Sequence, residues 1–362
     1  MSAKYDKMFD AAFLGKVTRK GDIISRLSEL HELLRDMPQL EQVDRPAGFR
    51  KTAAQLMSAR ILGNSDKDMR LLACCCIADI YRISAPDIPY SDEEVVSIFE
   101  VLVSQLRGLA TCDTSSGSGT KIFYILHSLA TVNTCVLPVL LASSGVAGAE
   151  DVVTGMFHAL ISSIRAEHDE ETSKLMTQVL LCCLEECEEV SQELLDVLLQ
   201  PLLPSFKAEN PTAYNLVGRV LQSAPAPTQA SVSAFLNQVL VGAPNGSQAR
   251  VAESELTDHI YPLIYEIHRL APDLLLKVLP NVCTQLMAEE EDVRLKAVKL
   301  LGRLFASTFA DYGNEFNRNF REFVARFVDV SPAVRLEMVD CAALILKRKP
   351  TLKDLVEKPL RE

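Results

Sequence analysis

The feature that most constrains the fold is a helical pattern that recurs about every 40 residues. Residues 91–109 show it clearly, because apolar residues at three- and four-residue steps follow the start Ser91-Asp92-Glu93-Glu94. Such spacing after a capping residue indicates an amphipathic helix. A single helical hairpin cannot bury its apolar face alone, so a repeated hairpin predicts an array rather than one globular core.

Two kinds of helix alternate along the chain. The first helices of the predicted hairpins cover residues 91–109, 150–165, 191–206, 228–241, 272–287 and 314–330. The second helices begin near Asp66, Thr120, Asp169, Pro211, Ala252, Glu291 and Pro332, at intervals of 54, 49, 42, 41, 39 and 41 residues. Such intervals are typical of HEAT and armadillo arrays. We therefore predict an all-α fold, an α-solenoid of HEAT-type hairpins.

We expect residues 1–362 to form a single array, irregular over 1–165 and more regular over 166–350. The first two intervals are long because of a proline-rich loop and Ser/Gly-rich insertions. Segment 351–362 starts another first helix without its partner, so we expect the chain to end inside a further repeat.

A short signature recurs in the second helices. Asp68-Met69-Arg70 and Asp292-Val293-Arg294 share it, and Val334-Arg335-Leu336 is a weaker copy. It resembles the HEAT pattern in which an acid of the turn and an arginine pair between neighbouring hairpins. Because a partly buried arginine needs such a partner, we expect Arg294 and Arg335 to be structural.

Composition and charge exclude several classes. Apolar runs are too short for a membrane span, and residues 1–10 lack a secretory signal. Residues 1–70 contain 13 basic and 10 acidic residues, and residues 289–362 contain 14 basic and 13 acidic residues. Residues 71–288, in contrast, contain 10 basic and 25 acidic residues. The acidic middle disfavours direct nucleic-acid binding. Consecutive cysteines within helices predict buried thiols and an intracellular protein.

No residue constellation suggests catalysis or a metal. The string Gly117-Ser118-Gly119-Thr120-Lys121 lacks the spacing of a phosphate-binding loop, and we interpret it as a linker. No CxxC pair and no helical HExxH arrangement occurs. We expect neither enzymatic activity nor a bound cofactor.

The loop Ala85-Pro86-Asp87-Ile88-Pro89-Tyr90 is the feature that a repeat array explains least. Two prolines fix φ and remove two backbone donors, so the loop is stiff. Tyr90 adds an amphipathic ring of the kind enriched at binding hot spots. The alternative is a turn that merely starts a helix, as Ala271-Pro272-Asp273 does later in the chain.

At this loop the chain resembles a known family. The run LACCCIADIYRISAPDIPY (residues 72–90) is similar to the signature of the cohesion regulators named for precocious dissociation of sisters, which are HEAT-repeat proteins associated with cohesin. Further segments resemble the family in the same order, namely residues 98–109, 122–132, 235–244, 271–282 and 323–339. The resemblance covers residues 20–362 and corresponds to the N-terminal part of a longer protein.

The resemblance implies a nuclear, chromatin-associated scaffold that regulates sister chromatid cohesion. Family members bind the cohesin kleisin, cooperate with the release factor Wapl, and support the acetylation and maintenance of cohesion. In the family this loop receives short aromatic-containing motifs from Wapl and from cohesion-protecting antagonists. Ala85, Pro86, Asp87, Pro89 and Tyr90 match it, whereas Ile88 replaces a usual alanine and Ser91 a usual threonine. We expect Asp87 to accept hydrogen bonds from such a peptide and Tyr90 to pack on its aromatic anchor. Vertebrate relatives have also been associated with inositol hexakisphosphate.

The residues also allow a function from another class. A general HEAT adaptor or transport receptor would capture basic protein partners on its acidic surface, which the charge of residues 71–288 favours. Kleisin contacts cannot be assigned to residues, although Arg303 and Arg321 offer candidate surfaces.

Overall fold

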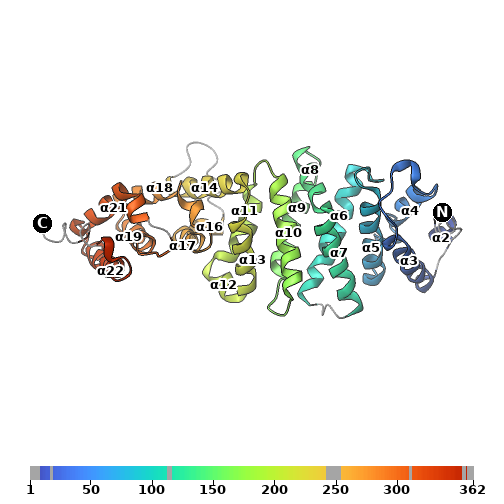
Figure 1. The fold of residues 1–362 in the computed structure, drawn as a ribbon, viewed down its shortest axis with the longest axis horizontal. Coiled ribbons are helices and arrows are strands. Elements are labelled where there is room, and N and C mark those ends of the chain that lie inside the picture. The colour runs from blue at the N-terminus through green and yellow to red at the C-terminus, as the bar shows by residue number, and fades with distance from the viewer. Residues whose placement is uncertain are drawn as a thin grey trace. The chain divides into compact units, whose positions relative to one another are not determined.

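The computed structural model describes residues 9–16, 19–111, 116–241, 254–309, 312–352 and 356. These residues form α-helices and short 3-10 helices, and none of them lies in a β-strand. The chain divides into two compact units, Met1–Glu188 and Glu189–Glu362, and the positions of the units relative to each other are not determined. Figure 1 shows the helical content of both. The all-α prediction is confirmed.

The first unit contains two rows of helices. Helices α3, α5, α7 and α10 pack side by side, and α6 and α9 pack together in the second row (Figure 1). The bounds are α2 Ala11–Gly15, α3 Lys20–Arg35, η1 Gln42–Asp44, α4 Phe49–Leu56, α5 Lys67–Ser84, α6 Asp92–Leu106, η2 Arg107–Ala110, α7 Gly117–Val132, η3 Thr134–Val136, α8 Leu137–Ser143, α9 Ala149–Ser163 and α10 Glu170–Glu186.

The second unit repeats this arrangement. Helices α13, α17, α19 and α22 form one row, and α14, α18 and α21 form the other. The bounds are α11 Gln192–Leu199, η4 Gln200–Leu202, α12 Pro204–Glu209, α13 Pro211–Gln222, α14 Ala226–Val241, α16 Glu255–Asp258, α17 Ile260–Leu270, η5 Pro272–Leu275, α18 Leu279–Thr284, η6 Gln285–Met287, α19 Glu291–Phe305, α20 Tyr312–Glu315, α21 Asn317–Val324, η7 Ala325–Val328, α22 Pro332–Arg348 and η8 Pro350–Leu352.

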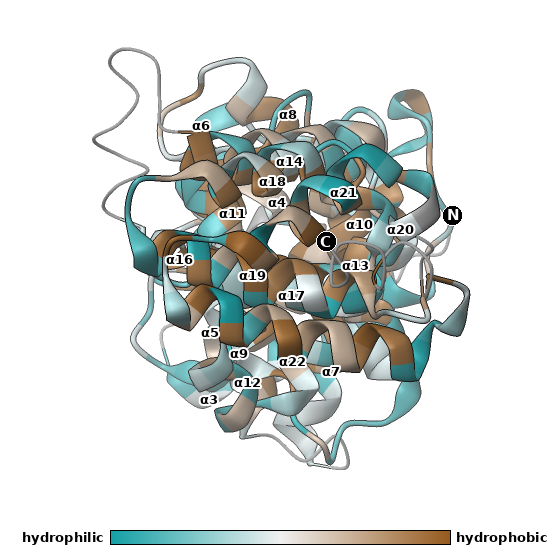
Figure 2. Cartoon of the chain, turned by 90° about the vertical axis from the view of Figure 1, so that its left-hand side faces the viewer, coloured by the Kyte–Doolittle hydropathy of each residue, from teal (hydrophilic) through white to brown (hydrophobic). Residues whose placement is uncertain are grey.

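The helical rows bury the apolar stripes that the sequence pattern predicts. Hydrophobic and hydrophilic stretches alternate along helices such as α19 (Figure 2). In the first unit α5 is buried on nearly all sides, from Leu71 to Ile77, because it packs against α3, α4, α6 and α7. Each buried aliphatic side chain contributes about 1.5–3 kcal/mol to folding. The predicted HEAT-type packing is thus present in each unit.

Prolines break two predicted helices. Residues 191–206 form α11, η4 and α12 rather than one helix, because Pro201 and Pro204 cannot donate the backbone hydrogen bonds of a helix interior. Residues 272–287 likewise divide into η5, α18 and η6, with Pro272 and Pro280 in the first turns of η5 and α18. The second helices that pair with these two segments, α13 and α19, are both present.

The long second interval contains a helix that the sequence analysis missed. Residues 137–143 form α8, which packs against α9, and the predicted Ser/Gly connection after it turns at Gly145 and Gly148. Both glycines adopt φ near +78°, at 77° and 79°, a conformation that side chains disfavour. The Gly117–Lys121 string is not a linker either, because it forms the first turn of α7, capped by Ser116.

The predicted structural role of Arg294 is confirmed, but its acidic partner is Asp329. The guanidinium of Arg294 is bonded to both carboxylate oxygens of Asp329, at 3.1 and 3.2 Å, and to the carbonyls of Ala288 and Glu289. Asp292, the acid expected from the signature, is exposed and pairs with Lys296 on its own helix. Arg335 repeats the turn contacts of Arg294, donating to the carbonyls of Asp329 and Val330.

Each cysteine of the described residues is a free thiol, and all but Cys182 are buried. Burial raises the pKa of the Cys75 thiol to about 12. Among the described residues no single helix is long and apolar enough to span a membrane. The pair formed by α7 and the segment Thr134–Ser143 is long and apolar enough, but it is bent by 81°.

Several predictions fall on residues outside the described part of the chain. They are the start of a second helix at Ala252 and most of segment 351–362. The prediction of a single array, with irregular hairpins before residue 165 and more regular hairpins after it, stays a prediction.

His268 in α17 gives the second unit a pH-dependent stability. The side chain is 1% exposed, and burial together with the nearby Lys349 lowers its pKa to about 4. The unfolded chain takes up this proton near pH 6.5, before the folded chain does. Stability is therefore highest above pH 6.5 and falls as the pH drops toward 4.

When the pH is lowered from 7.5 to 4.5, we expect the free energy of unfolding to fall less in His268→Leu than in the wild type. The difference between the two losses should be on the order of 2–3 kcal/mol. Urea unfolding followed by circular dichroism measures it. His127→Gln, at an exposed histidine, serves as the control and should follow the wild type. If the free energy of unfolding falls equally with pH in His268→Leu and the wild type, protonation of His268 does not determine the pH dependence.

Candidate functional site

The proline-rich loop joins α5 to α6 and is fixed at both ends. At its start the Ala85 amide donates to the Tyr81 carbonyl as the C-cap of α5. At its end Ser91 caps α6: its hydroxyl accepts from the Glu94 amide while the Glu94 carboxylate accepts from the Ser91 amide at 2.9 Å. This reciprocal capping box satisfies two donors at the helix start. The loop is thus held as stiffly as its prolines suggest.

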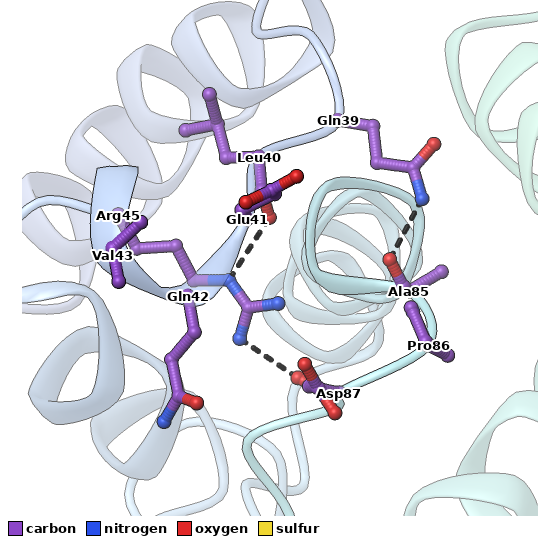
Figure 3. A pocket seen from close by; sticks show the side chains of 9 residues that line it. All are labelled: Gln39, Leu40, Glu41, Gln42, Val43, Arg45, Ala85, Pro86 and Asp87. Carbon is purple, nitrogen blue, oxygen red and sulfur yellow. Dashed lines mark hydrogen bonds between the residues drawn. The ribbon is translucent and has the colours of Figure 1, made fainter.

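A hollow of about 550 Å³ lies beside the first half of the loop (Figure 3). One wall is Ala85, Pro86 and Asp87; the other is the segment between α3 and α4. The residues of this second wall are Gln39, Leu40, Glu41, Gln42, Val43 and Arg45. The hollow therefore joins segments whose lining residues lie 40 or more positions apart in the sequence.

Arg45 ties the two walls together. Its guanidinium donates to the carbonyls of Ser84 and Asp87, each at 2.8 Å, and to that of Leu40 at 3.2 Å. Gln39 adds a side-chain bond to the Ala85 carbonyl at 2.7 Å, and Figure 3 shows both bridges. Because every acceptor is a backbone carbonyl, these bonds fix the path of the chain rather than a particular side chain.

A second arginine anchors the start of the 39–45 segment. Arg82, on α5, donates to the carbonyls of Leu34 and Met37 at the end of α3. It also bonds Asp79, a carboxylate that is only 1% exposed. A buried charge needs such partners to be tolerated.

Asp79 joins three helices of the first unit. Besides Arg82, it is bonded to the Tyr124 hydroxyl of α7 at 2.6 Å and to His31 Nδ1 of α3 at 3.0 Å. Burial and the bond to Asp79 raise the pKa of Tyr124. The end of α3, from which the second wall starts, is therefore held by the core itself.

Tyr90 does not lie where a peptide could pack on it. The ring is 8% exposed and packs edge-on against Tyr81, with ring centroids 5.6 Å apart. Its hydroxyl finds no partner among the described residues, and burial raises its pKa. The expectation that Tyr90 offers its ring to an aromatic anchor is wrong for this conformation, because the ring is part of the core beneath the loop.

The six predicted site residues thus divide into groups. Ala85, Pro86 and Asp87 line the hollow, whereas Ile88 and Pro89 are half-buried outside its lining and Tyr90 is buried. The 39–45 segment was missed because it carries no motif and no helical period. Only its tertiary contacts reveal it.

The chemistry of the hollow suits a short extended peptide. The carboxylates of Asp87 and Glu41 are exposed, and neither makes a hydrogen bond or ion pair within the described part of the chain. Val43 is 86% exposed beside them. Open acceptors next to an apolar side chain provide orientation and contact area for a bound segment. In the same part of the chain, no three His, Cys, Asp or Glu residues are grouped to hold a metal ion.

The rows of hairpins and the arginine contacts between successive turns define a HEAT-type repeat protein. A family model described as sister chromatid cohesion protein PDS5 matches residues 21–362. The chain belongs to this family.

Individual relatives are similar in sequence, and a solved structure is similar in fold. The human sister chromatid cohesion protein PDS5 homolog A is 33% identical over 338 residues, and the chicken PDS5 homolog B is 32% identical over 340. Each alignment covers 93% of this chain but only 24% and 23% of the relative. A chain in "Structure of the Pds5-Scc1 complex and implications for cohesin function" has a similar fold, with a TM-score of 0.75 at 20% identity over 92% of this chain and 49% of that one.

We expect Tyr90→Ala to destabilise the first unit by about 3–5 kcal/mol, because it removes a buried ring. Tyr90→Phe should stay within about 1 kcal/mol of wild type or be more stable, since the lost hydroxyl has no partner to leave behind. Urea unfolding of both variants measures this. A marked loss of stability in Tyr90→Phe would reveal an essential hydrogen bond at the hydroxyl.

Proposed function

We propose that this chain is a cohesin-associated scaffold that regulates sister chromatid cohesion by binding the cohesin kleisin and short motifs of release or protection factors such as Wapl. The main support for a peptide-binding site is the hollow whose two walls are joined by Arg45. A site that is ordered before binding loses less conformational entropy when a peptide enters it.

Membership in the family supports kleisin binding, and so does the similar solved structure, which is that of a Pds5-Scc1 complex. No residue here is assigned to it. Arg303 and Arg321 remain candidates, although the Arg303 guanidinium lies 3.7 Å from the centroid of the Tyr265 ring and is partly occupied by that stacking.

The proposed role is that of a nuclear, chromatin-associated scaffold without enzymatic activity. Membership in a family of sister chromatid cohesion proteins supports this role. Inositol hexakisphosphate is the one small ligand that the family resemblance suggests, and no residues are assigned to it.

Asp87 offers the sharpest test of the peptide site, because its carboxylate is exposed and outside the core packing. We expect Asp87→Asn to weaken the binding of a Wapl-tail peptide about tenfold, the usual worth of a hydrogen bond to a charged group. Val43→Ser should weaken it as well, through the second wall. Fluorescence anisotropy with overlapping tail peptides measures the affinities.

The matched control is Asp151→Asn, which neutralises an exposed acid in the first turn of α9. It should bind the peptide as the wild type does, and all three variants should unfold at the same urea concentration. Unchanged binding by Asp87→Asn and Val43→Ser would remove the peptide from this hollow.

The second candidate is a general adaptor that captures basic proteins, which the 10 basic against 25 acidic residues of segment 71–288 favour. Capture by distributed charge should weaken steeply as the salt concentration rises from about 50 to about 300 mM, because long-range attraction is screened. Docking in the hollow should change less. A steep salt dependence that Asp87→Asn leaves unaltered would favour the adaptor.

A further inference from the structure

We propose that Ser91 is a phosphorylation site for an acid-directed protein kinase and that its phosphate weakens peptide binding at the adjoining loop. The modification site stands on the structure of the α6 start alone. Its effect on binding rests on the function proposed above.

Ser91 combines an exposed hydroxyl with a continuous run of acids. The residue is exposed, and Asp92, Glu93 and Glu94 follow it directly. Kinases with a basic substrate groove select serines followed by carboxylates, through charge complementarity. Ser91 also has extended backbone angles, φ −76° and ψ 167°, as the residue just before the helix, so the hydroxyl lies outside the helical ladder.

A second serine allows an internal comparison. Ser65 is also exposed and is followed by Asp66, Lys67 and Asp68. A lysine interrupts this run, and the Asp66 carboxylate is already paired with Lys20 at 2.5 Å. The acids after Ser91 carry no ion pair to a basic residue within the described part of the chain, which makes Ser91 the preferred substrate.

The chemical step is an ordinary phosphoryl transfer. The Ser91 Oγ forms a bond to the γ-phosphorus of ATP while the bond from that phosphorus to the bridging oxygen breaks. ADP leaves, and the hydroxyl proton passes to the kinase's catalytic carboxylate.

The phosphate would act on the capping box. In the unmodified chain the Ser91 hydroxyl donates to Glu93 at 2.9 Å, and Glu94 accepts from the Ser91 amide at 2.9 Å. Phosphorylation removes the hydroxyl donor and adds about −1.5 to −2 charges beside these two carboxylates. Repulsion between the phosphate and the carboxylates of Glu93 and Glu94 opposes the attraction of the helix dipole and opens the capping box.

Opening the capping box releases one of the two fixed ends of the loop. Ser91 follows Tyr90 directly, so a displaced helix start moves the segment that leads back to Asp87. The wall of the hollow formed by Ala85, Pro86 and Asp87 is then less ordered before binding, and peptide affinity falls.

The experiment treats the full chain with casein kinase II and Mg²⁺-ATP and locates the phosphate by mass spectrometry. We expect stoichiometric modification at Ser91, none there in Ser91→Ala, and unaltered Ser91 modification in Ser65→Ala. Glu94→Gln should slow it about tenfold, because glutamine keeps the cap but removes the recognition charge. Modification at Ser65 instead, or no modification of Ser91 in the folded chain, would overturn the site.

Peptide affinity is then measured by anisotropy with the tightest-binding Wapl-tail peptide. The phosphorylated wild type should bind about fivefold more weakly, the worth of a helix cap, whereas kinase treatment should leave Ser91→Ala unchanged. Equal affinity before and after phosphorylation would overturn the regulatory role. If the unmodified chain binds none of the tail peptides, the proposed function and the regulatory role both fail, and the mapped phosphate still decides the site.

Discussion

A single buried carboxylate organises the part of the molecule that carries the candidate site. Asp79 is nearly inaccessible to solvent and is bonded to side chains from α3, α5 and α7. Removing the partners of such a buried charge would cost about 3–5 kcal/mol of stability. The hydrogen bonds of Asp79 therefore fix the positions of the three helices relative to one another. Through Arg82 the same carboxylate fixes where the second wall of the hollow begins. The second unit uses a buried carboxylate differently, because Asp329 lets Arg294 of one repeat bind the turn of the next and so sets the spacing of successive hairpins.

The sequence was sufficient for the fold class because a helix of the array buries one stripe, and that stripe is visible as a three- and four-residue period. Six of the seven predicted starts of second helices lie within the described residues, from Asp66 to Pro332, and each is close to an observed helix. The hydrophobic period does not show where prolines divide a helix, so residues 191–206 were predicted as one helix instead of α11, η4 and α12. It also overlooked α8, which is only seven residues long.

The candidate site was only half visible in the sequence. Proline spacing predicts a stiff loop, and the resemblance to the family added a role for it. Neither could show that Tyr90 points into the core, because an amphipathic ring suits both a hot spot and an aromatic cluster. The opposite wall depends on Arg45, whose partners are backbone carbonyls some 40 residues away. Because every residue has such a carbonyl, a sequence pattern cannot reveal these contacts.

That choice of partners has a consequence for how such a site can change. Arg45 binds the loop only through main-chain oxygens, which every amino acid supplies alike. The side chains at positions 87 and 88 can therefore be exchanged without altering the frame that presents them. The molecule separates the support of the loop from its chemical identity, so new partners can be accommodated by substitution while the two walls stay where they are.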